Sequence, residues 1–397
     1  MKLARRRDNQ QWILDWIVKT TGRVQNLEYD ERTVPEEVKS YRMIPRHIGK
    51  HAAHLERIAR AAEAAGHQAT APDVYYQAAR AYHEAQHAIF ADDDNRKMYY
   101  HSKLLECFDK AIAASPHPVE TVEIPWEKVS IQARFHCSPD RKPRPTVVTI
   151  PGMDGCKETS GDPLGRNYLR RGLHLLAIDG PGQGISNIRK IRVTDDNYER
   201  AMKACVDYLL TRPEVDPEKI GVFGGSFGSF WALRAASHDP RLKVCGASTA
   251  CYGNKVAIFE HASPRFKQVF MYMAGMRDEE EFDRMAERMT MEGYSEKVQC
   301  PTLLSIGEYD SLTYLEEAEA VFDNLAGPKE MWIFEDECHA QSDIKGLAGL
   351  NMNPFILDWM KDAFDGKYGP AHRRKVYVHA NEGAGPYDAE EIRGRLL

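Results

Sequence analysis

Long apolar runs, paired cysteines and an excess of positive charge are all missing from this sequence of 397 residues. No apolar stretch approaches the ~20 residues that a membrane-spanning helix requires. The basic residues 2–7 are followed by Asp8 and Asn9 rather than by the apolar segment of a signal peptide. The eight cysteines are scattered without a C-x-x-C pair, so no disulfide framework is expected. We therefore expect a cytoplasmic protein with reduced thiols and no membrane contact.

The charge balance argues against a nucleic-acid-binding protein. Lys and Arg number 53 against 59 Asp and Glu, which leaves a formal net charge of −6, whereas binding to a phosphate backbone needs a basic surface. Hydrophobic residues make up 43% of the chain and charged residues 28%, proportions typical of a globular protein with an ample core. The length allows one or two folding units. We expect a small-molecule substrate as the partner, and no nucleic acid.

Residues 1–117 are expected to form a helical domain. Residues 11–18 are amphipathic. Residues 73–113 repeat apolar positions at helical spacing, with one break at the acidic cluster 91–95. No strand pattern precedes Pro118, so the sheet is expected to begin after it.

Further along the chain the pattern changes to strands separated by helices. Residues 119–124 and 129–136 alternate apolar and polar positions and predict a hairpin. Short apolar runs then recur between helical stretches, an order that demands crossover connections and a mainly parallel sheet. The expected core strands lie at 146–150, 173–178, 220–223, 242–247, 302–306 and 331–334. The predicted fold class is therefore α/β, with its core at residues 118–250 and 300–367.

Two segments stand outside this core. Residues 251–299 have helical spacing and no strand pattern, and an insertion at that point would cover the strand ends as a lid. Residues 368–397 hold two Gly-Pro pairs and an alternating patch at 375–379. We expect this segment to be an extended arm that packs on the body or on the partner subunit of a homodimer, with a disordered tail as the alternative.

The strongest chemical signal is the run Gly224-Gly225-Ser226-Phe227-Gly228. It follows an expected strand and precedes a helical stretch, which is the context of a G-x-S-x-G nucleophile elbow. Glycines at both ends allow the backbone to turn tightly. The motif alone is common by chance, but its place at a strand end predicts that Ser226 is a nucleophile.

A serine nucleophile needs a base, and the base needs a carboxylate that orients it. Asp310 lies just after the expected strand 302–306, and His339 lies just after the expected strand 331–334. The chain order serine, acid, histidine fits a nucleophile elbow. Glu308 is the competing acid, and Asp310 taken singly could instead cap the helix that follows it.

An acyl-transfer site also needs N–H donors for the oxyanion. One donor is expected from Phe227, the residue after the nucleophile. The second is expected from Met153 in the loop 151–155 (Pro-Gly-Met-Asp-Gly), which follows the first core strand. The alternative for this loop is an ordinary glycine turn.

A second motif competes with the serine. His83, Glu84 and His87 satisfy H-E-x-x-H on an expected helix, the pattern that places two imidazoles on one face for zinc. Glu106 could supply a third ligand, but nothing else nearby completes a metal site. We expect no metal and no cofactor, and we assign His83 and His87 to helix packing or to the lining of the substrate pocket.

With these motifs the chain resembles the α/β-hydrolases. Within them it is most similar to the group that contains 2,6-dihydroxypseudooxynicotine hydrolase, the fermentation/respiration switch protein and fungal polyketide-shortening hydrolases. The matching features are the helical stretch 75–90, the loop 151–155, the run 179–184 (Asp-Gly-Pro-Gly-Gln-Gly) and the elbow at Ser226. The resemblance spans roughly residues 73–367.

Members of this group include enzymes that hydrolyse a carbon–carbon bond next to an aryl or β-dicarbonyl ketone with help from a lid carboxylate. The resemblance implies that Glu260 is the matching lid carboxylate, with a solvated or helix-capping residue as the alternative, and that the N-terminal helices frame the pocket. We therefore expect a serine hydrolase of aryl-ketone or polyketide-like substrates; a carboxylesterase or amidase, a zinc metallopeptidase and a non-catalytic regulatory binder are the alternatives. The expected substrate contacts are Asp154, Glu260, His83, His87 and Tyr252.

Overall fold

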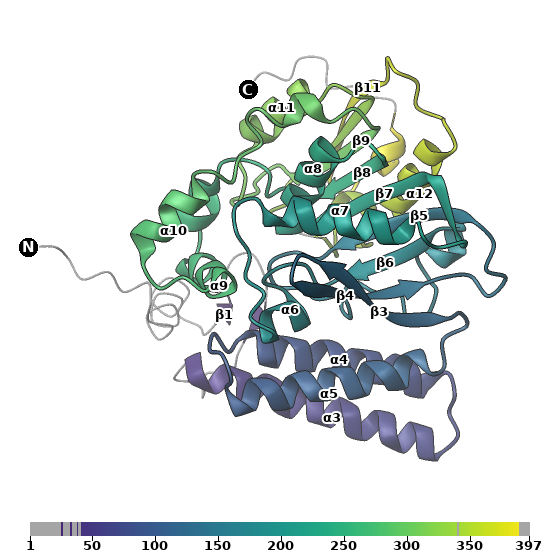
Figure 1. Ribbon diagram of the computed structural model, residues 1–397, viewed down its shortest axis with the longest axis vertical. Helices are drawn as coiled ribbons and strands as arrows, with labels where there is room; N and C mark the ends of the chain where they lie inside the picture. The colour runs from purple at the N-terminus through teal and green to yellow at the C-terminus, as the bar shows by residue number, and fades with distance from the viewer. Residues whose placement is uncertain (1–24, 27–31, 34–37, 39–40, 340, 389–397) are drawn as a thin grey trace, which may run out of the picture.

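A nine-stranded sheet with helices on both faces forms the body of the computed structural model (Figure 1). The structure describes residues 25–26, 32–33, 38, 41–339 and 341–388. The amphipathic segment 11–18 lies outside them. None of the helices among the described residues combines the length and the apolar character needed to cross a membrane.

The sheet is mixed but mainly parallel. Its strands are β3 (Val119–Trp126), β4 (Val129–His136), β5 (Arg144–Ile150), β6 (His174–Ile178), β7 (Val215–Gly225), β8 (Leu242–Ser248), β9 (Thr302–Gly307), β10 (Lys329–Phe334) and β11 (Arg373–Val378). Their spatial order is β11-β10-β9-β8-β7-β5-β6-β4-β3. β4 runs antiparallel to both β3 and β6, and the other neighbouring pairs are parallel. This arrangement confirms the predicted α/β class.

Two strand assignments differ from the sequence expectation. The segment 368–397, expected as an extended arm, contributes β11, which pairs parallel with β10 and buries Val376 and Val378 completely. A short pair, β1 (Gln25–Asn26) and β2 (Arg32–Thr33), lies in a region where no strand was expected. Both pairings involve short segments whose own sequence pattern is weak. Whether they form strands therefore depends on the strand that lies next to them.

Side chains on alternating positions of the strands build a core on each face of the sheet. In β5, Val148 and Ile150 belong to the core that also contains residues of α7, α8 and α11, whereas Val147 belongs to the core under α12. Tyr198 of α7 stacks on Trp231 of α8 with ring centroids 4.2 Å apart. The helices of the core are α6 (Gly184–Ile188), α7 (Asn197–Leu209), α8 (Phe227–His238), α11 (Leu315–Asn324) and α12 (Asn353–Phe364).

The N-terminal helices form a layer of their own beside the β3–β4 end of the sheet (Figure 1). They are α3 (Ile44–Ala64), α4 (Thr70–His87) and α5 (Asn95–Ile112), and they share a small core rich in alanine. Asp94 caps α5 by accepting from the backbone N–H groups of Arg96 and Lys97, which accounts for the predicted break at 91–95. Cys156, from the loop after β5, completes this small core. The helical layer therefore packs directly on that loop.

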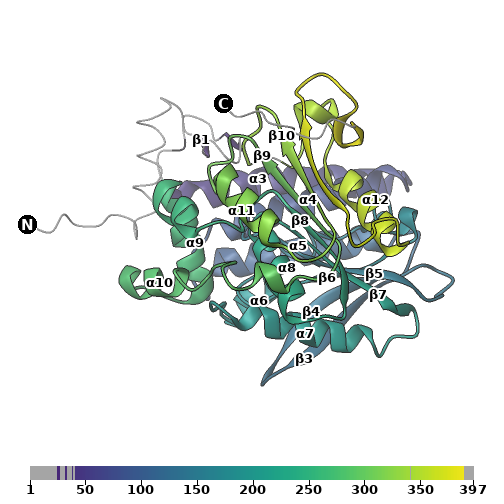
Figure 2. The same ribbon diagram turned by 90° about the horizontal axis from the view of Figure 1, so that it is seen from above.

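The insertion after β8 is helical and lies on one side of the twisted sheet (Figure 2). It comprises the π-helix η3 (Ala257–His261), α9 (Pro264–Ala274), α10 (Glu279–Ala286) and the short 3-10 turn η4 (Ser295–Lys297). Phe270 of α9 packs on Phe227 at the start of α8, with ring centroids 4.7 Å apart. Lys267 is fully buried and pairs with the carboxylates of Glu260 and Asp283. The lid is therefore anchored to the core by aromatic contacts and held internally by ion pairs.

Buried histidines predict a loss of stability in acid. Burial lowers the pKa of His136 to about 3 and the pKa of His87, His101 and His174 to about 4. These values lie below the ordinary pKa of about 6.5, so in acid the unfolded chain binds protons that the folded chain does not. The free energy of unfolding is therefore highest above pH 6.5. It falls by about 1.4 kcal/mol per pH unit for each group as the pH drops toward the pKa of the folded state. We expect the urea midpoint of unfolding to fall steeply between pH 7 and pH 5. An unchanged midpoint would contradict this account.

Candidate active site

Ser226 occupies the sharp turn between β7 and α8 in a strained backbone conformation. Its φ is 54° and its ψ is −130°, a combination that few residues other than glycine adopt. The flanking glycines are required by close packing. A Cβ on Gly224 would lie 2.0 Å from the carbonyl oxygen of Gly228, and a Cβ on Gly228 would lie 2.4 Å from the carbonyl oxygen of Ile150. The turn therefore has the features of the predicted elbow.

Three side chains from separate loops meet at this turn. The Ser226 hydroxyl donates to His339 Nε2 at 2.8 Å, and His339 Nδ1 donates to Asp310 Oδ2 at 2.8 Å. Asp310 follows β9 and its side chain is fully buried; His339 follows β10. Glu308, the competing acid, accepts from a backbone N–H at 3.2 Å. The structure thus brings together the serine, histidine and aspartate that the sequence singled out.

The surroundings of His339 favour its charged form. Burial by itself lowers the pKa of the imidazole, but the Asp310 carboxylate and the Cys251 thiol together outweigh burial and raise the pKa to about 10. Only the neutral imidazole can accept the proton of Ser226. A base of this kind becomes more effective as the pH rises.

Backbone groups of two loops surround the Ser226 hydroxyl. Phe227 begins α8, so its N–H lies at a helix N-terminus, where the partial positive charge favours an anion. The loop after β5 lies against the nucleophile, because a Cβ on Gly152 would be 3.0 Å from Ser226 Cβ and 3.6 Å from its hydroxyl oxygen. Met153, the expected second donor, follows Gly152 and is buried. These two segments are the ones expected to supply the oxyanion donors.

The run 179–184 supports the loop after β5. Gln183 Nε2 donates to the carbonyl oxygens of Pro151 and Gly152 at 2.8 and 2.7 Å. Its Oε1 accepts from the Tyr198 hydroxyl at 2.5 Å. These partners of Gln183 belong to the loop after β5 and to α7. Gln183 therefore holds the backbone that faces the nucleophile.

Replacing Gln183 by leucine is expected to lower kcat for a chromogenic ester such as 4-nitrophenyl butyrate by about 10- to 100-fold, because two carbonyl groups beside the nucleophile lose their donor. Tyr198→Phe is the matched control, since it removes only the hydroxyl that orients Gln183, and its effect should be smaller. Steady-state kinetics and a thermal melt on each variant provide the measurement. An unchanged kcat in Gln183→Leu would rule out this supporting role.

The H-E-x-x-H histidines contact Asp154 of the same loop. His83 Nε2 donates to the Asp154 backbone carbonyl at 2.6 Å, and His87 Nε2 donates to its Oδ1 at 2.8 Å. Burial lowers the pKa of both imidazoles, so they are neutral at pH 7. Arg265 of the lid helix α9 pairs with the other carboxylate oxygen at 3.0 Å. Asp154 is therefore the point where α4, the loop after β5 and the lid meet.

Among the described residues, His83 and His87 do not belong to a group of three or more potential metal ligands. Glu106, the suggested third ligand, pairs with Arg60 and Lys103. In the described part of the chain, the side chains spaced as metal ligands are those of Cys156, Glu158 and Asp179. The Lys157 ammonium already pairs with the carboxylates of Asp179 and Glu158, at 2.8 and 2.9 Å.

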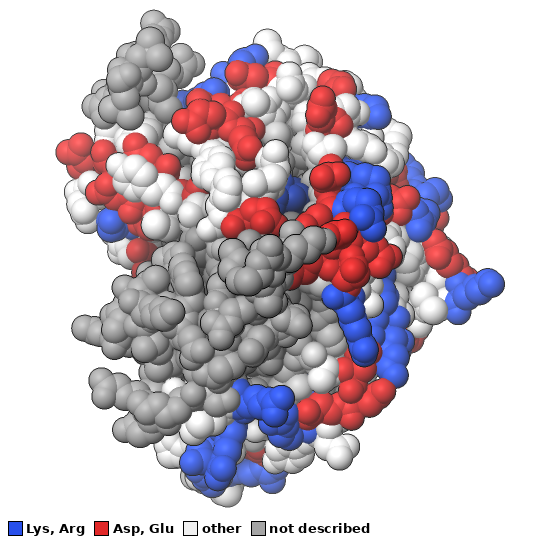
Figure 3. Space-filling model, turned by 90° about the vertical axis from the view of Figure 1, so that its left-hand side faces the viewer, with Lys and Arg blue, Asp and Glu red and all other residues white. Residues whose placement is uncertain are grey.

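Tyr252 and Glu260 line a cavity of about 680 Å³ between the lid and α11. Ser226 and His339 are not among the described residues that line it. The Glu260 carboxylate accepts from Lys267 Nζ at 2.7 Å, and acidic side chains are numerous on this face of the molecule (Figure 3). Contact of these two residues with substrate therefore stays a prediction. The ion pair with Lys267 ties the Glu260 carboxylate to α9.

Cys251 is a neighbour of the nucleophile that the sequence analysis missed. Its Sγ lies 3.8 Å from Ser226 Oγ, and its thiol interacts with His339 as well. It follows β8, which pairs parallel with β7. A scattered cysteine carries no signal of this role, because only the pairing of the two strands brings it to the serine.

Comparisons with known proteins identify the wider family. The family model of the prolyl oligopeptidase family matches residues 191–367, which contain Ser226, Asp310 and His339. The crystal structure of 2,6-dihydroxy-pseudo-oxynicotine hydrolase superposes with a TM-score of 0.71 at 23% identity, over 86% of this chain and 94% of that one. The 2,6-dihydropseudooxynicotine hydrolase of Paenarthrobacter nicotinovorans is 28% identical over 311 residues, 75% of this chain and 78% of the relative. The protein has the α/β-hydrolase fold.

This hydrolase is also similar to a fungal enzyme. The 20-hydroxy-prefusarin hydrolase of Gibberella moniliformis is 24% identical over 366 residues, 78% of this chain and 85% of the relative. These relatives are hydrolases and include the bacterial and fungal kinds that the sequence motifs indicated. The predicted resemblance and the prediction of an enzyme are confirmed.

Proposed function

We propose that this α/β-hydrolase is a serine hydrolase in which Ser226 is the nucleophile, His339 the general base and Asp310 the residue that orients the base. The observation that carries the proposal is the continuous hydrogen-bond chain from Ser226 through His339 to Asp310, with both distances at 2.8 Å. In this chain the Asp310 carboxylate keeps the proton on Nδ1, so that Nε2 is free to accept.

The reaction follows from this geometry. His339 takes the Ser226 proton as the hydroxyl attacks the substrate carbonyl, and the N–H groups of Phe227 and Met153 stabilise the oxyanion, with each donor worth about 3 kcal/mol in the transition state. The protonated imidazole then donates its proton to the leaving group. Water, activated by the same histidine, hydrolyses the acyl-enzyme and releases a carboxylic acid.

We further propose that the bond cleaved joins a carbonyl carbon to a carbon of an aryl or polyketide-like substrate. Such a leaving group departs as a carbanion, which must be delocalised into a phenol or a β-keto system and then protonated. The names of the bacterial and fungal relatives support substrates that carry these groups. The Asp154 carboxylate, about one-third exposed and held by His87 and Arg265, is suited to accept a hydrogen bond from a substrate hydroxyl.

Intact-mass analysis with a fluorophosphonate tests the nucleophile. We expect one adduct on the wild-type chain and none on Ser226→Ala, with zinc measured in the same sample. The labelled and unlabelled proteins are then compared on 1-(2,6-dihydroxyphenyl)butan-1-one, which yields resorcinol and butyrate if the carbon–carbon bond is hydrolysed, and on 4-nitrophenyl butyrate. Turnover of the ester alone would favour a carboxylesterase. No adduct together with stoichiometric zinc would overturn the serine mechanism in favour of His83 and His87.

A further inference from the structure

Gln268, in the middle of the lid helix α9, carries a buried amide without a hydrogen-bond partner. The residue is 7% exposed, and neither Oε1 nor Nε2 has a partner in the structure. Buried amides in proteins are almost always hydrogen-bonded, because leaving one unpaired destabilises the fold. An amide retained in this state is therefore a candidate for binding something other than the protein itself.

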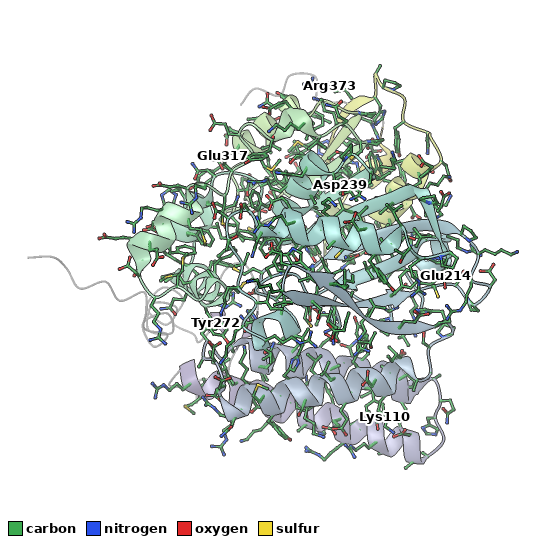
Figure 4. The ribbon with its side chains drawn as sticks, viewed as in Figure 1. Lys110, Glu214, Asp239, Tyr272, Glu317 and Arg373 are labelled. Carbon is green, nitrogen blue, oxygen red and sulfur yellow. The ribbon has the colours of Figure 1, made fainter. Side chains whose placement is uncertain are left out.

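The position of Gln268 on α9 indicates which way its side chain faces. Arg265, Gln268 and Tyr272 are spaced i, i+3 and i+7 and so share one face of the helix. Arg265 pairs with Asp154, and the Tyr272 ring stacks on Phe90 with centroids 6.1 Å apart. Figure 4 shows Tyr272 where α9 meets the N-terminal helices. The amide thus lies on the face that looks toward α4 and the loop after β5, away from Lys267.

The helix α9 also packs beside the nucleophile. Phe270 lies on the side of α9 roughly opposite Gln268 and packs on Phe227, the residue that follows Ser226. Tyr272 lines a cavity of about 20 Å³, enough for one water molecule, together with His83 and Met153. This cavity lies between α9, α4 and the loop after β5, the same elements that the face of α9 carrying Gln268 meets.

We propose that Gln268 is a specificity-determining residue whose amide binds oxygen substituents of the substrate. The proposal rests on the function proposed above and adds to it the chemistry of recognition. The amide Nε2 donates to a ketone or phenolate oxygen, and Oε1 accepts from a hydroxyl. A substrate with a carbonyl and a hydroxyl on adjacent positions, as in a hydroxyaryl ketone, satisfies both atoms, whereas a purely hydrocarbon chain satisfies neither.

Binding to a protein that cannot turn over provides the direct test. In the Ser226→Ala background, calorimetry should show that 2′,6′-dihydroxyacetophenone binds at least fivefold more tightly than acetophenone. Gln268→Met keeps the length and removes the amide, and the preference should fall below twofold. Gln299→Met is the control, because it makes the same change at an exposed position outside α9, and its preference should match that of the parent. A preference that survives Gln268→Met would overturn the proposal.

A melting experiment separates recognition from a structural role. Removing an unpaired buried amide should raise the Tm of Gln268→Met by about 1–2 °C without ligand. If Gln268 instead held the lid through a buried water, its replacement would lower the Tm. A lower Tm would therefore also overturn the proposal. Failure of the serine mechanism is recognised independently, because it would abolish fluorophosphonate labelling of the wild-type chain and leave the ligand preference unaffected.

Discussion

Ser226→Ala is expected to lower kcat by about 10⁴-fold or more on any substrate that the protein hydrolyses, because no other group replaces the attacking oxygen. KM should change little, since the serine hydroxyl contributes to bond making rather than to holding the substrate. The measurement is steady-state kinetics on the ester and on the hydroxyaryl ketone. Residual turnover should come only from the oxyanion donors and from substrate positioning.

The matched control for this loss is Ser237→Ala, at the other end of the same helix α8. Its hydroxyl donates to the Arg234 carbonyl within the helix at 2.7 Å, far along α8 from the elbow, so kcat should be unchanged. Both variants should melt close to the parent. If Ser226→Ala kept more than a tenth of the activity, another nucleophile, with Cys251 the nearest at 3.8 Å, would have to be considered.

Asp310→Asn should produce the second large loss, about 10⁴-fold in kcat near neutral pH, because an amide cannot hold the proton on His339 Nδ1 as the carboxylate does. The replacement should also shift the pH profile. The carboxylate raises the pKa of His339 while burial lowers it, so without the carboxylate the pKa falls. The rising limb of kcat/KM, which reports the neutral imidazole, should therefore move to lower pH in the variant.

Glu308→Gln tests whether Glu308, rather than Asp310, orients His339. Glu308 lies two residues before Asp310 and accepts from a backbone N–H, so its replacement should leave both the rate and the midpoint of the rising limb near the parent values. The reverse pattern, in which Glu308→Gln shows the large loss and Asp310→Asn does not, would reassign the acid.

The sequence predicted much of the site because the fold places its reactive groups by a simple rule. Ser226, Asp310 and His339 each follow an apolar run that forms a parallel strand, respectively β7, β9 and β10. The carboxyl ends of parallel strands lie at one edge of the sheet, so residues far apart in the chain converge there. Strand spacing and glycine positions were sufficient to predict this convergence.

Contacts made across the molecule were not predictable in this way. His83 and His87 satisfy a zinc motif by spacing, yet in the fold they donate to Asp154. Glu260 matches a lid carboxylate by its distance from the nucleophile, yet it pairs with the buried Lys267. In each case the spacing in the sequence fits both the expected role and the contact that is observed. The residue that makes the observed contact lies in a different helix or loop, where the spacing gives no information.

The sequence by itself therefore determined the α/β class, the elbow and the order of serine, acid and base, because these depend on periodicity and on glycines at a turn. Only the tertiary structure decided that β11 completes the sheet, that Gln183 supports the loop beside the nucleophile, that Cys251 lies next to Ser226, and that the Gln268 amide is buried without a partner. The physical reason is that hydrogen bonding, burial and charge pairing depend on distances between segments that a one-dimensional pattern does not contain.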